Sequence, residues 1–166
     1  IFANVKTMSF YKNHFNSKIN FYGARNPESI IDGKVNVVSV WKEQPNIEFG
    51  KNNKTIGQYA IKSLEAAVSA LKSDQIDVLV TAPINKENIQ SNQFKFPGHT
   101  DYLNQELEGD SLMFMVANHI KVGLLTDHVP LKDITRHLSA DLINEKIKTI
   151  TTSLKSDFLI PKPRVA

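Results

Sequence analysis

The chain has 166 residues, of which 41% are hydrophobic and 22% charged, a composition typical of a globular domain of ordinary size. The 20 Lys and Arg residues against 17 Asp and Glu give a net charge of +3 without any arginine-rich block, so nucleic-acid binding is not expected. Cysteine is absent, which excludes disulfides and thiolate metal sites, and no apolar run approaches the roughly 20 residues of a membrane span.

The first half of the chain predicts a strand, a polar loop and a long helix. Residues 34–41 (KVNVVSVW) are rich in valine, as strands are. The loop that follows contains a short predicted edge strand at residues 47–49. Apolar residues then recur every three or four positions from Thr55 to Ser73, which predicts a helix with Thr55 as its N-cap.

Residues 75–83 (QIDVLVTAP) form an unbroken apolar run, typical of a strand that is covered on both faces. A long helix followed closely by such a strand indicates an α/β fold with a partly parallel sheet. The polar residues 84–91 then predict a short helix, and another helix begins at Thr100.

The second half of the chain predicts a β-hairpin and a final helix. Two apolar runs, residues 112–117 and 122–126, flank a turn that lacks the usual Asn-Gly pair. The hairpin is apolar on more than one side, so we expect it to pack on another subunit or on a further domain. Pro130 is expected at the first position of a helical segment, and Ser139 caps a long helix that ends near Ser156.

Both ends of the chain have the pattern of a polypeptide that continues. Ile1 lies in an apolar start that could be the middle of a strand, and Pro161 and Pro163 precede what reads as the beginning of another strand. We therefore expect residues 1–166 to be a single α/β fragment of a larger, two-domain protein.

The segment Val-Thr-Ala-Pro-Ile-Asn-Lys at residues 80–86 is the first candidate site. It would bring Asn85 and Lys86 to the carboxyl end of the predicted strand, where open α/β sheets bind ligands. There Lys86 could neutralise a phosphate or carboxylate, and Asn85 could donate a hydrogen bond to it. The alternative is that Lys86 is an ordinary solvated lysine of a loop.

His99 and Thr100 form the second candidate site, directly after the flexible Gly98. If Thr100 caps the next helix, the backbone amides of the first turn point outward as anion donors. His99 could then hold a substrate hydroxyl or phosphate, or move a proton near neutral pH. The alternative is that Thr100 only caps the helix and that His99 is an exposed turn residue.

His128 is the third candidate, at the end of a predicted strand and shortly before Pro130. A histidine fixed in such a place is suited to bind a metal, with Asp127 or a backbone carbonyl orienting its second ring nitrogen. One histidine does not make a metal site, and neither His119 nor His137 has a ligand spacing with it. We predict that His99 and His128 open onto one cleft at the rim of the sheet, but the residues alone indicate no reaction.

Three segments resemble the 4-hydroxythreonine-4-phosphate dehydrogenase family: residues 77–90 (DVLVTAPINKENIQ), 96–103 (FPGHTDYL) and 124–134 (LLTDHVPLKDI). The resemblance implies a fold similar to isocitrate and isopropylmalate dehydrogenases, with a mixed sheet flanked by helices. It also implies NAD-dependent oxidation of 4-phosphooxy-threonine, followed by loss of carbon dioxide to give an aminoketone phosphate in vitamin B6 biosynthesis. The enzyme would be a cytoplasmic homodimer with its active site at the dimer interface.

The resemblance also implies roles for individual residues. His99 and Thr100 match the family's substrate-binding pair, and His128 matches the first of three metal-binding histidines that the two subunits contribute. Asp101 stands where glutamate is commoner, and Asp127 stands where threonine or glycine is usual. The metal would act as a Lewis acid on the substrate; imidazole ligands suit Zn²⁺ or Co²⁺, whereas Mg²⁺ prefers oxygen ligands. No residue is assigned to proton transfer.

Two segments that are typical of the family have no match in this chain. One is an amino-terminal segment similar to GDPxGIGPE, and the other is a later segment similar to NPHAG that carries the second metal-binding histidine. We therefore expect the 166-residue chain alone not to turn over substrate. Two alternatives stay open: a paralogous dehydrogenase of a phosphorylated four-carbon sugar acid, such as threonate or erythronate phosphate, and a non-catalytic ligand-binding domain whose histidines are structural.

Overall fold

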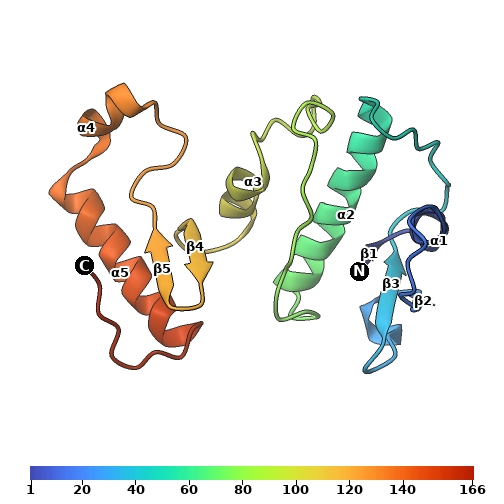
Figure 1. Ribbon diagram of the computed structural model, residues 1–166, viewed down its shortest axis with the longest axis horizontal. Helices are drawn as coiled ribbons and strands as arrows, with labels where there is room; N and C mark the ends of the chain where they lie inside the picture. The colour runs from blue at the N-terminus through green and yellow to red at the C-terminus, as the bar shows by residue number, and fades with distance from the viewer. The chain divides into compact units, whose positions relative to one another are not determined.

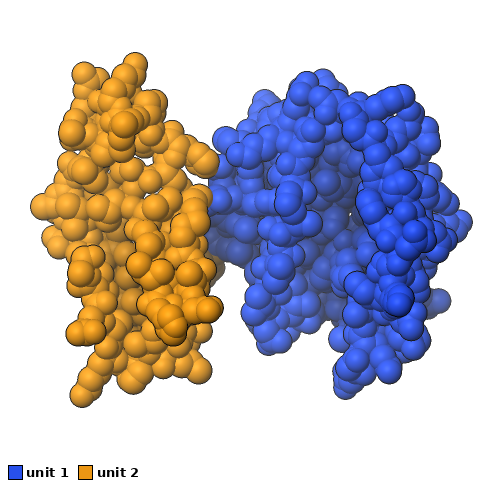
Figure 2. Space-filling model, viewed as in Figure 1, with its two compact units in different colours: residues 1–107 blue, residues 108–166 orange.

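All residues from 1 to 166 are described by the computed structural model, which Figure 1 shows as a ribbon. The chain divides into two units, Ile1–Leu107 and Glu108–Ala166, which are coloured separately in Figure 2. Each unit is described below by itself. Both combine helices with a small sheet, so the mixed α/β class predicted from the sequence is confirmed. None of the helices is both long and apolar enough to span a membrane.

Unit 1 contains a three-stranded sheet in the order β1–β3–β2, and all of its strands are parallel. β3 (Val35–Ser39) lies between β1 (Phe2–Ala3) and β2 (Phe21–Ala24). Val37 of β3 is fully buried, as expected for the central strand of a covered sheet. The strand predicted at residues 34–41 is therefore confirmed, and the expected parallel pairing is present in this sheet.

The first helix, α1 (Val5–His14), connects β1 to β2 and is anchored by Asn4 at its N-cap. The side-chain oxygen of Asn4 accepts a hydrogen bond from the amide of Thr7 (3.0 Å), and its side-chain nitrogen donates to the carbonyl of Trp41 (2.6 Å). Asn4 is buried, so these bonds compensate for the loss of hydration. They tie the start of α1 to the chain just after β3.

The long helix predicted from the apolar periodicity is confirmed as α2 (Lys54–Lys72). The predicted N-cap is wrong, because Asn53 and not Thr55 caps this helix. The side-chain oxygen of Asn53 accepts hydrogen bonds from the amides of Thr55 (2.9 Å) and Ile56 (3.4 Å). Asparagine caps at least as well as threonine, so the helix begins one residue earlier than the periodicity alone indicates.

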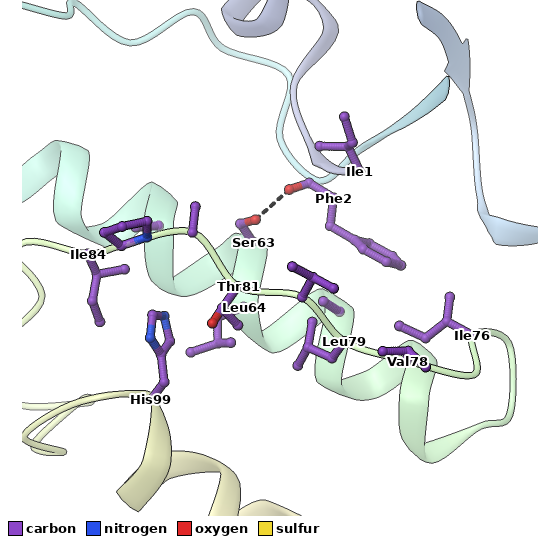
Figure 3. A pocket seen from close by; sticks show the side chains of 15 residues that line it. Ile1, Phe2, Ser63, Leu64, Ile76, Val78, Leu79, Thr81, Ile84 and His99 are labelled. Atoms are coloured by element: carbon purple, nitrogen blue, oxygen red, sulfur yellow. Dashed lines mark hydrogen bonds between the residues drawn. The ribbon is translucent and has the colours of Figure 1, made fainter. Parts of the chain in front are cut away.

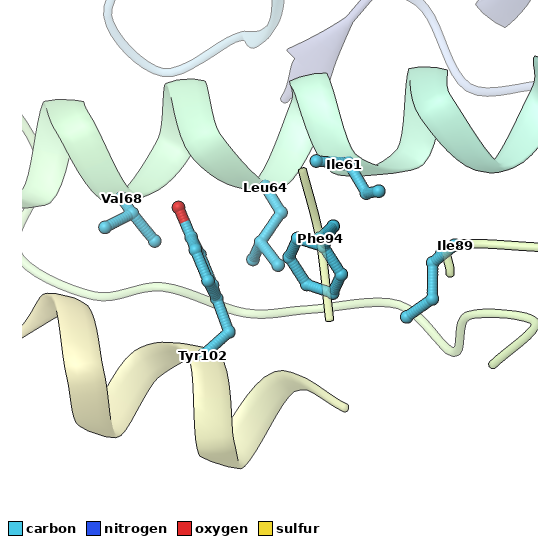
Figure 4. Close-up of a cluster of buried hydrophobic side chains, with 6 residues drawn as sticks. All are labelled: Ile61, Leu64, Val68, Ile89, Phe94 and Tyr102. Atoms are coloured by element: carbon cyan, nitrogen blue, oxygen red, sulfur yellow. The ribbon is translucent and has the colours of Figure 1, made fainter. Parts of the chain in front are cut away.

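The core of unit 1 lies between α2, the helix α3 (His99–Glu106) and the segment that joins them (Figure 4). Its buried members are Ile61, Leu64, Val68, Ile89, Phe94 and Tyr102. The ring centroids of Phe94 and Tyr102 are 5.2 Å apart, a distance typical of packed aromatic pairs. This packing holds α3 against the loop that precedes it and so fixes the position of His99.

The strand predicted at residues 75–83 is wrong. These residues pair with no strand of the chain, and Val78 and Val80 are 72% and 88% exposed. An apolar run indicates that a segment has something to pack against, but a strand also needs a neighbouring backbone within hydrogen-bonding distance. Here a cavity, and not a paired strand, separates this segment from β1.

Two shorter predictions are also wrong. Residues 47–49 belong to an irregular loop, in which Phe49 packs on the aromatic rings of α1 and not beside a strand. Residues 84–91 form turns and not a helix. The side-chain oxygen of Asn85 accepts hydrogen bonds from the amides two and three residues later, both at 3.0 Å, and such bonds favour turns over helix.

The hairpin predicted in the second half is confirmed in unit 2. β4 (Phe114–Ala117) and β5 (Ile120–Gly123) are antiparallel, and Ala117 pairs with Ile120 across a two-residue turn. β5 ends at Gly123, earlier than the apolar run that extends to Thr126. The residues after Gly123 therefore leave the hairpin before they reach His128.

The final helix is confirmed as α5 (Ala140–Ser156), and its predicted cap is correct. The hydroxyl of Ser139 accepts a hydrogen bond from the amide of Leu142 at 3.1 Å. Between the hairpin and α5, the predicted helical segment consists of the 3₁₀ turn η2 (Leu131–Asp133) and the short α4 (Ile134–His137). Pro130 precedes this segment as its N-cap and is not its first helical residue, which corrects the predicted position by one residue.

The two faces of the hairpin differ. On one face, a Cβ built at Gly123 would lie 2.8 Å from the Cδ1 atom of Ile150 in α5, and Phe114 packs edge-on against Phe158 with ring centroids 5.9 Å apart. Because side chains alternate along a strand, the opposite face carries Met115, Ala117, Ile120 and Val122. All four are exposed, which leaves this face of the hairpin apolar and uncovered in the chain.

Candidate functional site

A cavity of about 490 Å³ opens in unit 1 between β1, α2 and the extended residues 76–84 (Figure 3). Most of its lining is apolar, and its polar side chains are Ser63, Thr81 and His99. The hydroxyl of Ser63 already donates a hydrogen bond to the carbonyl of Phe2. His99 and Thr81 are therefore the side chains of the lining best placed to interact with a polar ligand.

His99 is the first residue of α3, and its ring is directed toward the extended segment in Figure 3. The N-cap of α3 is Gly98, so the prediction that Thr100 caps this helix is wrong. Gly98 has no side chain to accept from the first amides of α3, and no side-chain hydrogen bond caps them. These amides, with the positive end of the helix dipole, remain available to an anion.

Partial burial lowers the pKa of His99 below 6.5, because the charged imidazolium loses hydration beside the cavity wall. The ring is therefore mostly neutral at pH 7. A neutral imidazole has one nitrogen that donates and one that accepts, so His99 can bind a hydroxyl or a phosphate oxygen without adding a charge.

We expect an NMR titration of the folded chain to give His99 a midpoint below 6.5. The unfolded chain then binds this proton at higher pH than the folded chain, so folding stability decreases as the pH falls from 6.5 toward the lowered value. A His99→Gln variant should lose this part of the pH dependence. A midpoint at or above 6.5 would contradict the burial argument.

The turn after Pro83 places Lys86 at the start of the same helix. A Cβ built at Gly98 would lie 3.7 Å from the Cε atom and 4.0 Å from the Nζ atom of Lys86. The ammonium group therefore lies beside the residue that precedes His99. Of the predicted site residues, the structure brings Lys86, His99 and Thr100 together at this helix terminus.

Asn85 belongs to the same turn, but its side chain is engaged within the protein. Its oxygen accepts from the amides of Glu87 and Asn88, and its nitrogen donates to the side-chain oxygen of Asn52 at 3.0 Å. A direct contact of Asn85 with a ligand therefore stays a prediction. The sequence did not reveal the contact that Asn52 makes with this turn. The available signal was the pair Asn52-Asn53 before α2: one asparagine is enough to cap the helix, so the other is free to bind elsewhere.

His128 lies in unit 2, in the loop after β5, and its side chain is exposed. It does not end the strand as predicted. Its backbone has a φ of +54°, in the left-handed region that residues other than glycine rarely adopt. The direction of this ring is therefore set by an unusual loop conformation and not by the hairpin.

The residues of this chain do not by themselves fit a metal site. No group of three or more His, Asp or Glu side chains is arranged to hold a metal ion, whereas a catalytic zinc needs about three protein ligands. The role of His128 as one such ligand stays a prediction. His99 and His128 belong to different units, so their common cleft stays a prediction as well.

Comparison with known proteins matches the whole chain to one protein family. Residues 1–166 match the model of the family described as "Pyridoxal phosphate biosynthetic protein PdxA". The chain is 34% identical to the 4-hydroxythreonine-4-phosphate dehydrogenase of Bacteroides thetaiotaomicron, over 100% of this chain and 46% of that protein. It is 36% identical to the enzyme of the same name from Sulfurihydrogenibium sp., over 73% of this chain and 38% of that protein. The chain thus spans about half the length of the curated relatives that it matches.

Solved structures show the same fold. A 4-hydroxythreonine-4-phosphate dehydrogenase from Burkholderia phymatum superposes with a TM-score of 0.83 at 23% identity, over 98% of this chain and 50% of that one. The enzyme of that name from Klebsiella pneumoniae gives a TM-score of 0.80 at 19% identity, over 93% of this chain and 48% of that one. At these identities the likeness establishes the architecture, and activity needs separate support.

Proposed function

Because the chain belongs to the PdxA family of pyridoxal phosphate biosynthetic proteins, we propose that it forms part of an enzyme that converts 4-phosphooxy-L-threonine to 3-amino-2-oxopropyl phosphate. The reaction oxidises the substrate hydroxyl with NAD and releases carbon dioxide. The family match over residues 1–166 is the observation that carries this proposal, and the dehydrogenase names of the relatives support it. The enzyme is then a cytoplasmic homodimer with an architecture related to isocitrate and isopropylmalate dehydrogenases.

In this enzyme the start of α3 binds the anionic substrate. Lys86 supplies a positive charge, the first amides of α3 supply backbone donors, and Thr100 and the neutral His99 supply side-chain donors. Donors of these kinds at a helix terminus favour a phosphate or carboxylate group. Asn85 contributes by shaping the turn that carries Lys86, and a direct contact with the substrate would require it to release its present partners.

When bound, NAD would supply the hydride acceptor, and the protein would supply position and charge. Within the same proposal His128 is one ligand of a divalent metal, which is Zn²⁺, Co²⁺ or Mg²⁺. The remaining ligands would come from outside this chain, because no three His, Asp or Glu side chains of the chain are grouped to hold a metal ion.

An assay of NAD reduction on a longer protein that contains this chain tests the proposal. We expect NADH and carbon dioxide to form from 4-phosphooxy-L-threonine, with a higher kcat/KM than for phosphorylated threonate or erythronate. These sugar acids carry a hydroxyl where the substrate has an amino group, so a site that binds the charged amino group favours the amino acid. The 166-residue chain alone should form no NADH.

Two results, one from this assay and one from binding measurements on the same protein, would contradict the proposal. A preference for the sugar acids would identify the paralogous dehydrogenase. Metal and ligand binding to the longer protein without any oxidation would identify a non-catalytic binding domain.

The exposed face of the hairpin supports the homodimer. Its four apolar side chains, Met115, Ala117, Ile120 and Val122, are uncovered in the chain, and a subunit contact would bury them. We expect Val122→Lys to convert the dimer to monomers in sedimentation experiments, because an unpaired ammonium is costly to bury. Leu131→Lys, which changes an 86% exposed apolar residue elsewhere in unit 2, is the matched control and should leave the dimer intact. A dimer that tolerates Val122→Lys would exclude this face as the contact.

A further inference from the structure

We propose that Asn52 is a positioning residue, which holds the turn at residues 85–88 and thereby sets the place of Lys86 beside the start of α3. The anion that Lys86 receives there follows from the proposed function, whereas the position of the turn depends only on contacts within this chain. Asn52 lies in the loop between β3 and α2, more than 30 residues before the turn, so no local pattern links the two segments.

Two hydrogen bonds of opposite direction join Asn52 to the turn. Its side-chain oxygen accepts from the side-chain nitrogen of Asn85 at 3.0 Å, and its side-chain nitrogen donates to the Oε2 atom of Glu87 at 3.0 Å. The oxygen of Asn85 in turn accepts from the amides of Glu87 and Asn88. A continuous hydrogen-bonded path therefore runs from the loop before α2 to the backbone of the turn, and Lys86 lies inside it.

The turn is also fixed from the side of α2. A Cβ built at Gly57 would lie 2.0 Å from the carbonyl oxygen of Asn88, so helix and turn are in direct backbone contact. The next residue, Ile89, is almost fully buried in the core. The carboxyl end of the turn is thus held by its contact with α2 and by the buried Ile89. Asn52 supplies a second restraint at the amino end of the turn.

Asn52 can act as a restraint because its own backbone is held on both sides. Asn53 caps α2. Three residues before Asn52, the ring of Phe49 packs among rings of α1 and its C-cap, at centroid distances between 4.2 and 6.0 Å: His14, Phe15, Tyr11 and Phe10. A side chain on a backbone that is already ordered loses less conformational entropy when it forms its bonds.

The position of Asn52 gives a specific expectation for mutants. Asn52 is exposed, so its removal should barely change the global stability of the chain. The effect should instead appear in the turn and in the affinity of the site next to it. Removing the side chain of its neighbour Asn53 should lower the global stability and leave the turn unchanged, because Asn53 caps α2 and makes no side-chain bond to the turn.

The experiment compares Asn52→Ala with Asn53→Ala in the 166-residue chain. Asn52→Ala should raise hydrogen exchange at the amides of Glu87 and Asn88 by about tenfold, with a nearly unchanged Tm. It should also weaken the binding of inorganic phosphate, followed by the NMR signals of His99 and Lys86, by about five- to tenfold. Asn53→Ala should lower the Tm by roughly 2–4 °C and leave the turn and the phosphate affinity as they are.

A double variant tests whether the two hydrogen bonds themselves are responsible. Asn52→Asp places a carboxylate against Glu87 and should be at least as disruptive as Asn52→Ala. Adding Glu87→Gln gives that carboxylate two amide donors, one from Asn85 and one from the new side chain, so exchange and phosphate affinity should return to within about twofold of the wild type. A role of Asn52 in general folding would not produce this rescue.

The outcomes separate the positioning role from the proposed function. Unchanged exchange at Glu87 and Asn88 in Asn52→Ala, or a double variant without rescue, would overturn the role of Asn52. The wild-type chain could bind no phosphate while Asn52→Ala still raises hydrogen exchange at the amides of Glu87 and Asn88. That result would support the positioning role and contradict the anion site of the proposed function.

Discussion

Replacing Gly57 by alanine is expected to destabilise the chain by about 2 kcal/mol. The added methyl group would lie 2.0 Å from the carbonyl oxygen and 2.4 Å from the carbonyl carbon of Asn88. Both are backbone atoms, so no side-chain rotation relieves the clash, and α2 must separate from the turn. The overlap costs roughly 3 kcal/mol, and the higher helix propensity of alanine recovers about 1 kcal/mol of this.

Urea unfolding followed by circular dichroism measures this loss. Gln58→Ala is the control, because it makes the same residue at the next, exposed position of α2 and should change stability by no more than about 0.5 kcal/mol. The NMR signals of the turn should shift in Gly57→Ala only. A Gly57→Ala chain as stable as the wild type would show that α2 and the turn are not in direct contact.

Replacing Lys86 by methionine is expected to lower the kcat/KM of the complete enzyme by about 100-fold. Methionine preserves an unbranched apolar side chain but removes the ammonium group beside the start of α3, and a hydrogen bond between charged groups contributes about 1.5–3 kcal/mol. Lys86→Arg should recover only part of the activity, because it restores the charge but not the compact shape of the ammonium group.

Initial rates of NADH formation over a range of substrate concentrations measure the effect. Lys95→Met removes another exposed lysine of unit 1 and should leave kcat/KM within about twofold of the wild type. The Tm of Lys86→Met should also be unchanged, which separates lost binding from lost folding. Equal losses in the two variants would mean that net charge, and not a contact of Lys86, controls the reaction.

The two long helices were the most predictable part of this fold. α2 and α5 follow from apolar residues that recur at a period of 3.6, and the caps of both lie within a residue or two of the predicted starts. The hairpin was predictable for a similar reason, because its partner strands are separated by two residues only. In each case the evidence lies within one short segment of the chain.

Residues 75–83 show that a local apolar pattern is not sufficient to predict a strand. Their apolar run indicates packing, but whether it becomes a strand depends on a second backbone beside it, and β1 lies across a cavity instead. The same limit applies to Thr100. Its place before a helix made it a plausible cap, whereas α3 already begins at His99 with Gly98 as its N-cap.

By itself, the sequence determined the α/β class, the principal helices, the hairpin and three segments characteristic of a known family, because these depend on residue types at short spacing. Only the tertiary structure decided that Lys86 lies beside the start of α3, that Gly57 contacts the backbone of Asn88, and that Asn52 binds Asn85 and Glu87. These contacts join segments that are far apart along the chain, so they exist only after the whole of unit 1 has packed around its core.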